Sequence, residues 1–347
     1  MKVTLEQVAQ KANVSRRTVD RVINSRGNVR PEVEQKVRGV LKELNYQPNK
    51  LASALAYSKT PVMIGFIYQK EGFRNFDESV ERGIRDAVSE LKDFGISVEV
   101  VHGNIHMPKT YLKAIDDLVK KGAVGFVMRG ADHPVLREKI NELYLQNIPV
   151  VTFNSDIPKS QRQCFIGQDS YQSGKVAGSV MATLVREKEK ILICCGIPEY
   201  DAHHKRVDGF VYELKKNGFD EEQWVILHTE GSYDATCRSM EMIFRSEEKI
   251  KGIYMSVEPN KACADILLKL NLREKPFVIC HDASAENIEY LKNEIFDFII
   301  DQNIYMQSYR ALITMKDMLR FGKKQEVKEK TSDLMIYNAI SFGKRIY

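Results

Sequence analysis

The sequence lacks the features that define several large classes of protein. Its longest apolar runs, such as Ile191–Gly196, are far shorter than the roughly 18–20 residues of a membrane-spanning helix, so we expect no contact with a membrane. Its six cysteines contain no C-x-x-C pair, and most lie within apolar runs, which favours reduced core thiols over disulfides or zinc ligands. Polar residues interrupt the N-terminus where a secretory signal would be apolar, so we expect the protein to be cytoplasmic.

The common motifs of nucleotide-binding and hydrolytic enzymes are also missing. No G-x-G-x-x-G follows the first predicted strand, and neither G-x-x-x-x-G-K-[ST] nor G-x-S-x-G occurs. The histidine pairs His102/His106 and His203/His204 have no third ligand nearby, which a zinc site would need. We therefore expect no catalytic residues, no metal and no cofactor.

Positive charge is concentrated at one end of the chain. Residues 1–60 contain 12 Lys/Arg and 5 Asp/Glu, a net charge of +7, whereas residues 61–347 contain 40 and 42, a net charge of −2. A basic segment on an otherwise balanced chain is typical of a part that meets a polyanion such as nucleic acid.

The basic segment has the pattern of a helix-turn-helix. Thr4 and Gln7 form a predicted capping box at the start of a helix that runs to about Lys11. A break at Asn13–Val14 follows, and Ser15 caps a second helix over residues 16–24, whose apolar positions face the first helix. The arginines of this second helix then point outward from its first turns, as in a helix that enters the major groove.

A third helix is predicted to begin at Pro31 and to end at Asn45. One apolar stripe would close a three-helix core, formed by Val33, Val37, Val40, Leu41 and Leu44. The next stretch, Asn49–Ser58, has helical propensity but is too short to be stable alone in water. A partner must therefore stabilise this helix.

The runs VTLEQVAQKANVSRRTVDRVIN and NVRPEVEQKVRGVLKELNYQPNKLASAL resemble the DNA-binding headpiece and hinge of the lactose-repressor/galactose-repressor family. The resemblance implies double-stranded operator DNA as a partner, with Arg16, Arg17 and Arg21 reading base edges. It places Ser15, Thr18 and Asn24 on phosphates, and Leu55 as a wedge in the minor groove. Thr4 and Asn49 complete the DNA-binding set that the resemblance implies.

Two residues depart from the family pattern. Asp20 stands where the family usually has Ser, and an acid on a DNA-facing helix repels phosphate. We favour an ion pair with Arg16 or Arg17; the alternatives are a bond from a cytosine amino group or a side chain that points away. Arg30 stands where a helix-capping Ser or Thr is usual.

From Pro61 onward, short β-rich runs alternate with amphipathic helices. The predicted strands are Val62–Tyr68, Ile96–Val101, Val124–Arg129, Pro149–Asn154, Lys190–Cys195, Trp224–Thr229, Gly252–Ser256, Phe277–His281 and Phe298–Gln302. Predicted helices between them include Phe76–Phe94, Lys109–Lys121, Tyr171–Glu187, His204–Asn217, Cys237–Arg245 and Asn303–Phe321. Such a pattern predicts two doubly wound α/β lobes with parallel sheets, and ligands in the cleft at the carboxyl ends of the strands.

The predicted fold class is therefore an α+β multidomain chain. It consists of an all-α helix-turn-helix headpiece at residues 1–46, a hinge helix and linker at residues 47–60, and a two-lobed α/β domain at residues 61–347 for effector binding and dimerisation.

This second region resembles the type I periplasmic sugar-binding fold through IPVVTFNSD, FIGQDSYQSGKVAG, KRVDGF, VICHDASAE and FIIDQN. The resemblance implies an effector pocket lined by Phe76, Asp77, Arg129, Asn154, Ser155, Arg206, Asp282 and Gln302. Carboxylates, amides and guanidinium groups suit sugar hydroxyls, which both donate and accept hydrogen bonds, and Phe76 can stack on a pyranose face. Val257–Glu258 replaces a more usual polar Asn-Asp pair, which indicates an altered hydrogen-bond set.

The sequence alone does not distinguish among a sugar, a sugar phosphate and a sugar acid as the effector. Arg74, Arg129 and Arg206 all fall near strand ends, and their convergence would favour a phosphorylated or carboxylated ligand.

Together these features predict a DNA-binding transcriptional regulator, most consistent with a repressor, that works as a homodimer on a pseudo-palindromic operator. The alternative is a cytosolic sugar-binding protein or a sugar-modifying enzyme with an N-terminal helical appendage. For an enzyme, Asp77 with Asp282 is the candidate acid/base pair.

Overall fold

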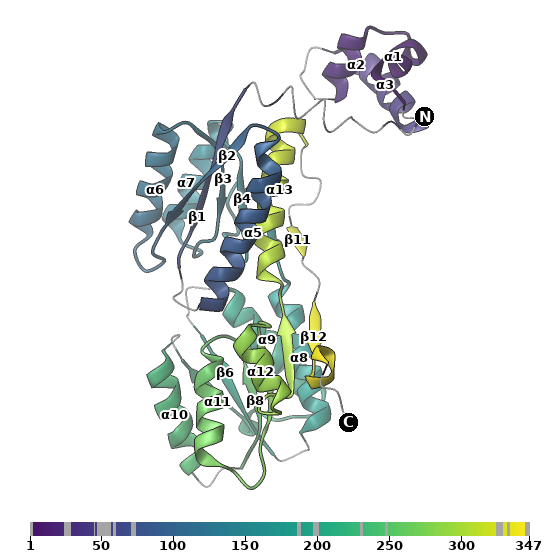
Figure 1. Ribbon diagram of the computed structural model, residues 1–347. Helices are drawn as coiled ribbons and strands as arrows, with labels where there is room; N and C mark the ends of the chain where they lie inside the picture. The colour runs from purple at the N-terminus through teal and green to yellow at the C-terminus, as the bar shows by residue number, and fades with distance from the viewer. Residues whose placement is uncertain are drawn as a thin grey trace.

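The computed structural model describes residues 3–23, 29–44, 46, 57, 60–70, 74–185, 189–196, 201–229, 232–246, 249–323, 329–331 and 334–343, with the side chains at 74, 75, 201 and 330 excepted. A small helical headpiece is followed by two α/β lobes that stack end to end (Figure 1). Across the described residues no helix has the length and apolarity needed to span a membrane.

The headpiece is a three-helix bundle made of α1 (Leu5–Ala12), α2 (Arg16–Ile23) and α3 (Pro31–Glu43). The turn after α1 passes through Asn13, whose φ of 51° is a left-handed conformation that asparagine tolerates better than most residues. Val8, Val19 and Val37 have no exposed surface and meet at the centre. The predicted helix starts are confirmed, and each predicted end lies within two residues of the observed one.

Lobe 1 is built on a six-stranded sheet in the order β11-β5-β4-β3-β1-β2. Its strands are β1 (Val62–Tyr68), β2 (Ile96–His102), β3 (Ala123–Met128), β4 (Val150–Phe153), β5 (Cys164–Gly167) and β11 (Glu329–Thr331), all paired in parallel. Its helices are α5 (Arg74–Lys92), α6 (Pro108–Lys120), α7 (Pro134–Leu145) and α13 (Ile304–Phe321).

Lobe 2 repeats this design with the sheet order β12-β10-β9-β8-β6-β7. Its strands are β6 (Lys190–Cys195), β7 (Trp224–His228), β8 (Ile250–Met255), β9 (Phe277–His281), β10 (Phe298–Asp301) and the antiparallel β12 (Met335–Tyr337). Its helices are α8 (Ser170–Leu184), α9 (Asp201–Lys216), α10 (Tyr233–Arg245), α11 (Asn260–Leu270) and α12 (Ala285–Lys292), with short 3₁₀ turns η1 (Glu221–Gln223) and η2 (Ala339–Phe342).

The chain passes between the lobes at three places: from β5 to α8, from β10 to α13, and from β11 to β12. The first two crossings are tied together, because the Gln168 side-chain amide donates to the Asp301 carbonyl at 3.1 Å. The two doubly wound lobes that the sequence predicts are confirmed. The nine predicted strands all form, while β5, β11 and β12 were not predicted.

Two glycines let α8 and α9 pack backbone against backbone, and this contact fixes the helix that carries Arg206. A Cβ on Gly174 would lie 2.0 Å from the Arg206 carbonyl oxygen, and a Cβ on Gly209 would lie 2.1 Å from the Tyr171 carbonyl oxygen. No side chain fits at either position without moving one helix.

Gly209→Ala should therefore destabilise lobe 2 by about 1–3 kcal/mol, because the added methyl group meets backbone that cannot swing aside. Thermal unfolding followed by circular dichroism measures the change. Gly39→Ala in α3 is the control, since no atom lies within 4 Å of its added carbon, and it should leave the unfolding of the lobes unchanged. Equal unfolding temperatures for wild type and Gly209→Ala would contradict the backbone contact.

Candidate functional sites: the headpiece surface and the interlobe cluster

The first turn of α2 presents positive charge to solvent. Arg16 and Arg17 are exposed, while Val19 and Val22 of the same helix are buried against the other helices, as the sequence predicted. The Ser15 hydroxyl accepts a hydrogen bond from the Thr18 N–H at 3.1 Å and so caps the helix. An exposed helix N-terminus with two arginines is suited to bind phosphate and base edges.

The neighbours of this turn also have defined positions. Thr4 and Gln7 form the predicted capping box of α1. The recorded ion pair of Arg16 is with Glu6, at 3.9 Å. Burial raises the pKa of Tyr46, and the charges of Arg16 and Asp20 act on the same hydroxyl, so both lie near it. An Asp20 ion pair with an arginine of α2 stays a prediction.

The structure leaves part of the predicted DNA-binding set untested. Arg21 is half-buried on the last turns of α2. Asn24, Asn49 and Leu55 lie outside the described residues, as does most of the predicted hinge at residues 47–60.

A second group of polar residues gathers where the lobes meet, at the carboxyl ends of parallel strands. Asn154 follows β4, Asp282 follows β9 and Asn303 follows β10, and all three adopt left-handed backbone, with φ of 59°, 70° and 54°. Asn and Asp are the residues that tolerate this conformation best after glycine. Each strand therefore ends in a sharp turn, and such strained turns concentrate at functional sites.

Gln302, in the second crossing, joins the two lobes. Its amide nitrogen donates to Asp282 Oδ1 of lobe 2 at 2.7 Å, and its amide oxygen accepts from Asn154 Nδ2 of lobe 1 at 3.0 Å. Gln307, on the first turns of α13, accepts from the same Asn154 nitrogen at 3.1 Å and donates to the Gln302 carbonyl at 2.7 Å. Gln307 could not be predicted as a site residue, because a Gln within a helix has no recognisable sequence pattern.

Arg129, at the end of β3, extends this network within lobe 1. Its Nε donates to Asn154 Oδ1 at 2.8 Å, and its guanidinium carbon lies 4.5 Å from the centre of the Phe76 ring. The side chain is only 5% exposed. One face of Phe76, predicted to stack on a sugar, is thus covered by a guanidinium group in this state.

Arg206 of α9 approaches from lobe 2. Its Nη1 donates to the Ser256 carbonyl at 2.8 Å, whereas its buried Nε has no hydrogen-bond partner among the described residues. Burial raises the pKa of Asp282, and the charges of Arg206 and Arg129 oppose that rise. The charges of both guanidinium groups therefore act on this one carboxylate.

Six of the eight predicted effector residues therefore form one connected group, here called the interlobe cluster: Phe76, Arg129, Asn154, Arg206, Asp282 and Gln302. Ser155 is buried directly after Asn154. Asp77 lies on α5 beside Phe76, and its charge acts on Tyr68 and Lys70. The side chain of Arg74 is outside the described residues, so the convergence of three arginines stays a prediction.

Glu258 is a functional candidate that sequence reasoning noted only as a departure from a pattern. It follows β8, next to Asp282 at the end of β9, and accepts hydrogen bonds from Asn260 N at 2.6 Å and Asn260 Nδ2 at 3.2 Å. Burial raises its pKa to about 7, and the charge of Asp282 adds to this. This carboxyl therefore keeps its proton to a higher pH than an exposed Glu, and in the protonated form it can donate as well as accept a hydrogen bond.

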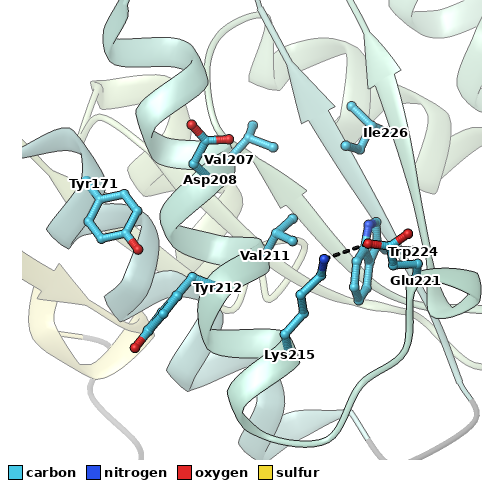
Figure 2. Close-up of a pocket in the computed structure, with 9 residues that line it drawn as sticks. All are labelled: Tyr171, Val207, Asp208, Val211, Tyr212, Lys215, Glu221, Trp224 and Ile226. Carbon is cyan, nitrogen blue, oxygen red and sulfur yellow. Dashed lines mark hydrogen bonds and ion pairs between the residues drawn. The ribbon is translucent and has the colours of Figure 1, made fainter.

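A separate groove of about 690 Å³ lies in lobe 2 (Figure 2). Helix α9 forms one wall, and η1 and β7 form the other, with a Lys215–Glu221 ion pair across it. Its lining residues are Tyr171, Val207, Asp208, Val211, Tyr212, Lys215, Glu221, Trp224 and Ile226, none of which belongs to the interlobe cluster.

Two family models match the chain. Residues 4–49 match the model described as bacterial regulatory proteins, lacI family, and residues 64–324 match a periplasmic binding protein domain. Among curated proteins, the chain is similar to catabolite control protein A of Priestia megaterium, with 26% identity over 260 residues, 74% of this chain and 75% of that protein. The match to the protein of the same name from Staphylococcus epidermidis has 32% identity but spans only 45% of each chain.

Solved structures share the fold of the two lobes. GanP, a glucose-galactose binding protein from Geobacillus stearothermophilus, has a TM-score of 0.69 and 21% identity, over 81% of this chain and 98% of that chain. A solute binding protein from Burkholderia graminis in complex with D-arabinose has a TM-score of 0.73 and 17% identity, over 82% and 97%. A protein from Bacteroides fragilis described as a putative LacI transcriptional regulator has a TM-score of 0.69 and 20% identity, over 81% of this chain and 98% of that chain.

The raised pKa of Glu258 predicts a pH dependence of stability. The folded protein holds this proton up to about pH 7, whereas an unfolded Glu releases it near pH 4.5, so folding becomes less favourable as the pH rises between these values. Glu258→Gln cannot ionise and so does not lose this stability. Its free energy of unfolding should therefore rise by about 2–3 kcal/mol relative to that of wild type between pH 4.5 and pH 8.

Urea unfolding at a series of pH values measures this difference. Glu222→Gln, at an exposed position in η1, is the matched control and should follow wild type throughout. A Glu258→Gln curve that runs parallel to wild type over this range would show that the carboxyl ionises normally.

Proposed function

This chain belongs to the lacI family of bacterial regulatory proteins and carries a periplasmic binding protein domain, and we propose that its lobes bind a sugar or sugar derivative that controls operator binding. It is a DNA-binding transcription regulator. The observation on which the effector proposal rests is the interlobe cluster, in which side chains from both lobes meet through Gln302.

The charges of the cluster favour a neutral, hydroxyl-rich effector. Arg129 and Arg206 both act on Asp282, so their positive charge is partly balanced before any ligand arrives. A phosphate would have to compete with that carboxylate for the guanidinium groups. Sugar hydroxyls can instead use the amides, the protonated form of Glu258 and the Arg206 Nε, which has no partner among the described residues, as mixed donors and acceptors.

Ligand control requires that the effector favours one arrangement of the lobes over another. A ligand that bonds to Asn154, Gln302 or Asp282 must replace hydrogen bonds that now tie lobe 1 to lobe 2. We propose that this exchange changes the angle between the lobes and, in a homodimer, the spacing of the two headpieces on a pseudo-palindromic operator. Action as a repressor in the cytoplasm is part of the same proposal.

The headpiece proposal assigns base reading to Arg16 and Arg17, and phosphate contact to Ser15 and Thr18. Arg17→Ala should weaken binding to an operator fragment, selected from fragmented genomic DNA, by about 1–3 kcal/mol and relax its sequence preference. Fluorescence anisotropy at several salt concentrations measures both the affinity and the number of phosphate contacts.

Arg38→Ala provides the control, because this exposed arginine lies on α3 rather than α2 and pairs with Glu34 of its own helix at 2.7 Å. It should change operator affinity by less than about twofold. If Arg17→Ala binds the operator as tightly and as selectively as wild type, α2 is not the recognition helix.

A thermal-shift screen tests the effector proposal. The panel contains D-glucose, D-galactose and D-arabinose with their phosphates and acids, because one protein of this fold is named for glucose and galactose and another is described in complex with D-arabinose. A ligand at one hundred times its dissociation constant should stabilise the protein by about 2.7 kcal/mol. We expect neutral sugars to give the larger shifts, and Arg206→Ala to abolish them.

The control is Arg245→Ala, at an exposed position of α10 paired with Glu241, which should keep the full shift. An Arg206→Ala protein that also keeps it would remove Arg206 from the site. Formation of product from any sugar on the panel would instead favour the enzyme alternative with Asp77 and Asp282 as acid and base.

A further inference from the structure

Helices α5 and α13 lie side by side along lobe 1 and link the interlobe cluster to the region where the headpiece linker ends (Figure 1). Both begin at the cluster: Phe76 is in the first turn of α5, and Gln302 directly precedes the cap of α13. Both end at the opposite side of the lobe, α5 at Lys92 and α13 at Phe321.

Polar bonds fasten these two helices to each other along their length. Tyr305 donates to Asp86 at 2.8 Å, Tyr309 donates to Glu90 at 2.8 Å, and the Lys316 ammonium group donates to the same Glu90 at 2.5 Å. The helices are also close at Gly83, since a Cβ there would lie 2.1 Å from the Ser308 hydroxyl oxygen. They therefore move as one unit.

At the far end of this unit, Tyr57 is held against Arg320. The Tyr57 hydroxyl donates to the Arg320 carbonyl, and the Arg320 guanidinium carbon lies 5.1 Å from the centre of the Tyr57 ring. The Tyr57 ring also meets Phe321 edge-on at 5.8 Å. Tyr57 is 9% exposed and belongs to the core of lobe 1, although it lies in sequence between the headpiece and β1.

Arg320 connects three segments at this point. Its Nη2 donates to the Thr60 carbonyl at 2.9 Å and to the Gly95 carbonyl, just after α5, at 3.0 Å. The side chain is 7% exposed, and burial lowers its pKa. Nη2 and the Tyr57 ring therefore hold this guanidinium group, while its buried Nε has no hydrogen-bond partner among the described residues. A displacement that broke the Nη2 bonds would leave a buried charge without partners, so the contact restricts the position of the linker end.

We propose that Tyr57 and Arg320 are positioning residues that lock the end of the headpiece linker onto the paired helices α5 and α13, and so transmit the state of the interlobe cluster to the headpiece. A change at Phe76 or Gln302 that shifts either helix start also shifts the other end, because the helices are fastened together. The linker, held by Tyr57 and Thr60, follows that shift.

Operator affinity of the full-length chain tests the lock directly. Tyr57→Ala should weaken operator binding by about fivefold or more, because the headpiece is then no longer held in one position relative to its lobe. Tyr57→Phe, which keeps the ring and removes only the hydroxyl bond, and Arg320→Lys, which loses the paired carbonyl contacts, should give smaller losses in the same direction. Tyr290→Phe on α12, whose hydroxyl donates to Glu286 at 3.1 Å, is the matched control and should bind like wild type.

Limited trypsin digestion of the same proteins separates positioning from misfolding. Release of the headpiece should be faster in Tyr57→Ala and Arg320→Lys than in wild type, while circular dichroism at the assay temperature shows that the lobes are folded. Their unfolding temperature should fall, because both side chains are buried in lobe 1. Operator affinities within twofold of wild type for Tyr57→Ala, with the headpiece folded, would overturn the proposal. If Tyr57→Ala does not fold, the same criterion applies to Tyr57→Phe and Arg320→Lys together.

The transmission part rests on the proposed sugar effector, and a second measurement isolates it. A panel sugar that binds wild type should change the operator affinity of wild type, and the ratio of the affinities with and without sugar measures this coupling. In Tyr57→Ala this ratio should approach one. The dissociation constant of the sugar itself, measured without DNA, should stay within twofold of wild type. An unchanged ratio would overturn transmission through Tyr57. If no panel sugar binds wild type, the proposed effector class fails, and the operator and trypsin measurements still decide whether the lock exists.

Discussion

The hydrogen bonds of Gln302 to Asn154 and to Asp282 are the constraint on which the arrangement of the lobes depends. Asn154 and Asp282 reach Gln302 from left-handed turns directly after β4 and β9, a conformation that Asn and Asp tolerate better than most residues. In a low-dielectric junction, polar groups must find partners, so the lobes are held together by the same atoms that a hydroxyl-bearing ligand would use. Binding and interlobe geometry therefore cannot vary independently.

Much of this architecture could be predicted from the sequence. Strands such as β1 and β6 were predicted to the residue, because long apolar runs between helical segments indicate buried parallel strands. The strands β5, β11 and β12 contain only three or four residues each and form at the crossings, where pairing depends on how the chain returns from the other lobe. No local pattern could reveal that pairing.

The residues of the interlobe cluster could be predicted from the sequence, but the contacts between them could not. Strand ends could be recognised from the pattern, and the family resemblance supplied the residue types. The placement of Arg129 over Phe76 and the bond from Asn154 to Gln307 depend on side-chain packing that sequence spacing does not specify. Glu258 illustrates the same limit, since its raised pKa comes from burial beside Asp282, which only the fold creates.

The repeated crossing of the chain has a consequence for the order in which the protein is synthesised. Helix α13 and strand β11 complete lobe 1, yet they follow the five parallel strands of lobe 2 in the chain. During synthesis the whole headpiece leaves the ribosome first. Residues 62–167 of lobe 1 follow, and part of their apolar surface stays exposed to solvent until α13 has been synthesised up to residue 321. Lobe 2 is thus an insertion in the chain of lobe 1, and its parallel strands are synthesised before lobe 1 is complete.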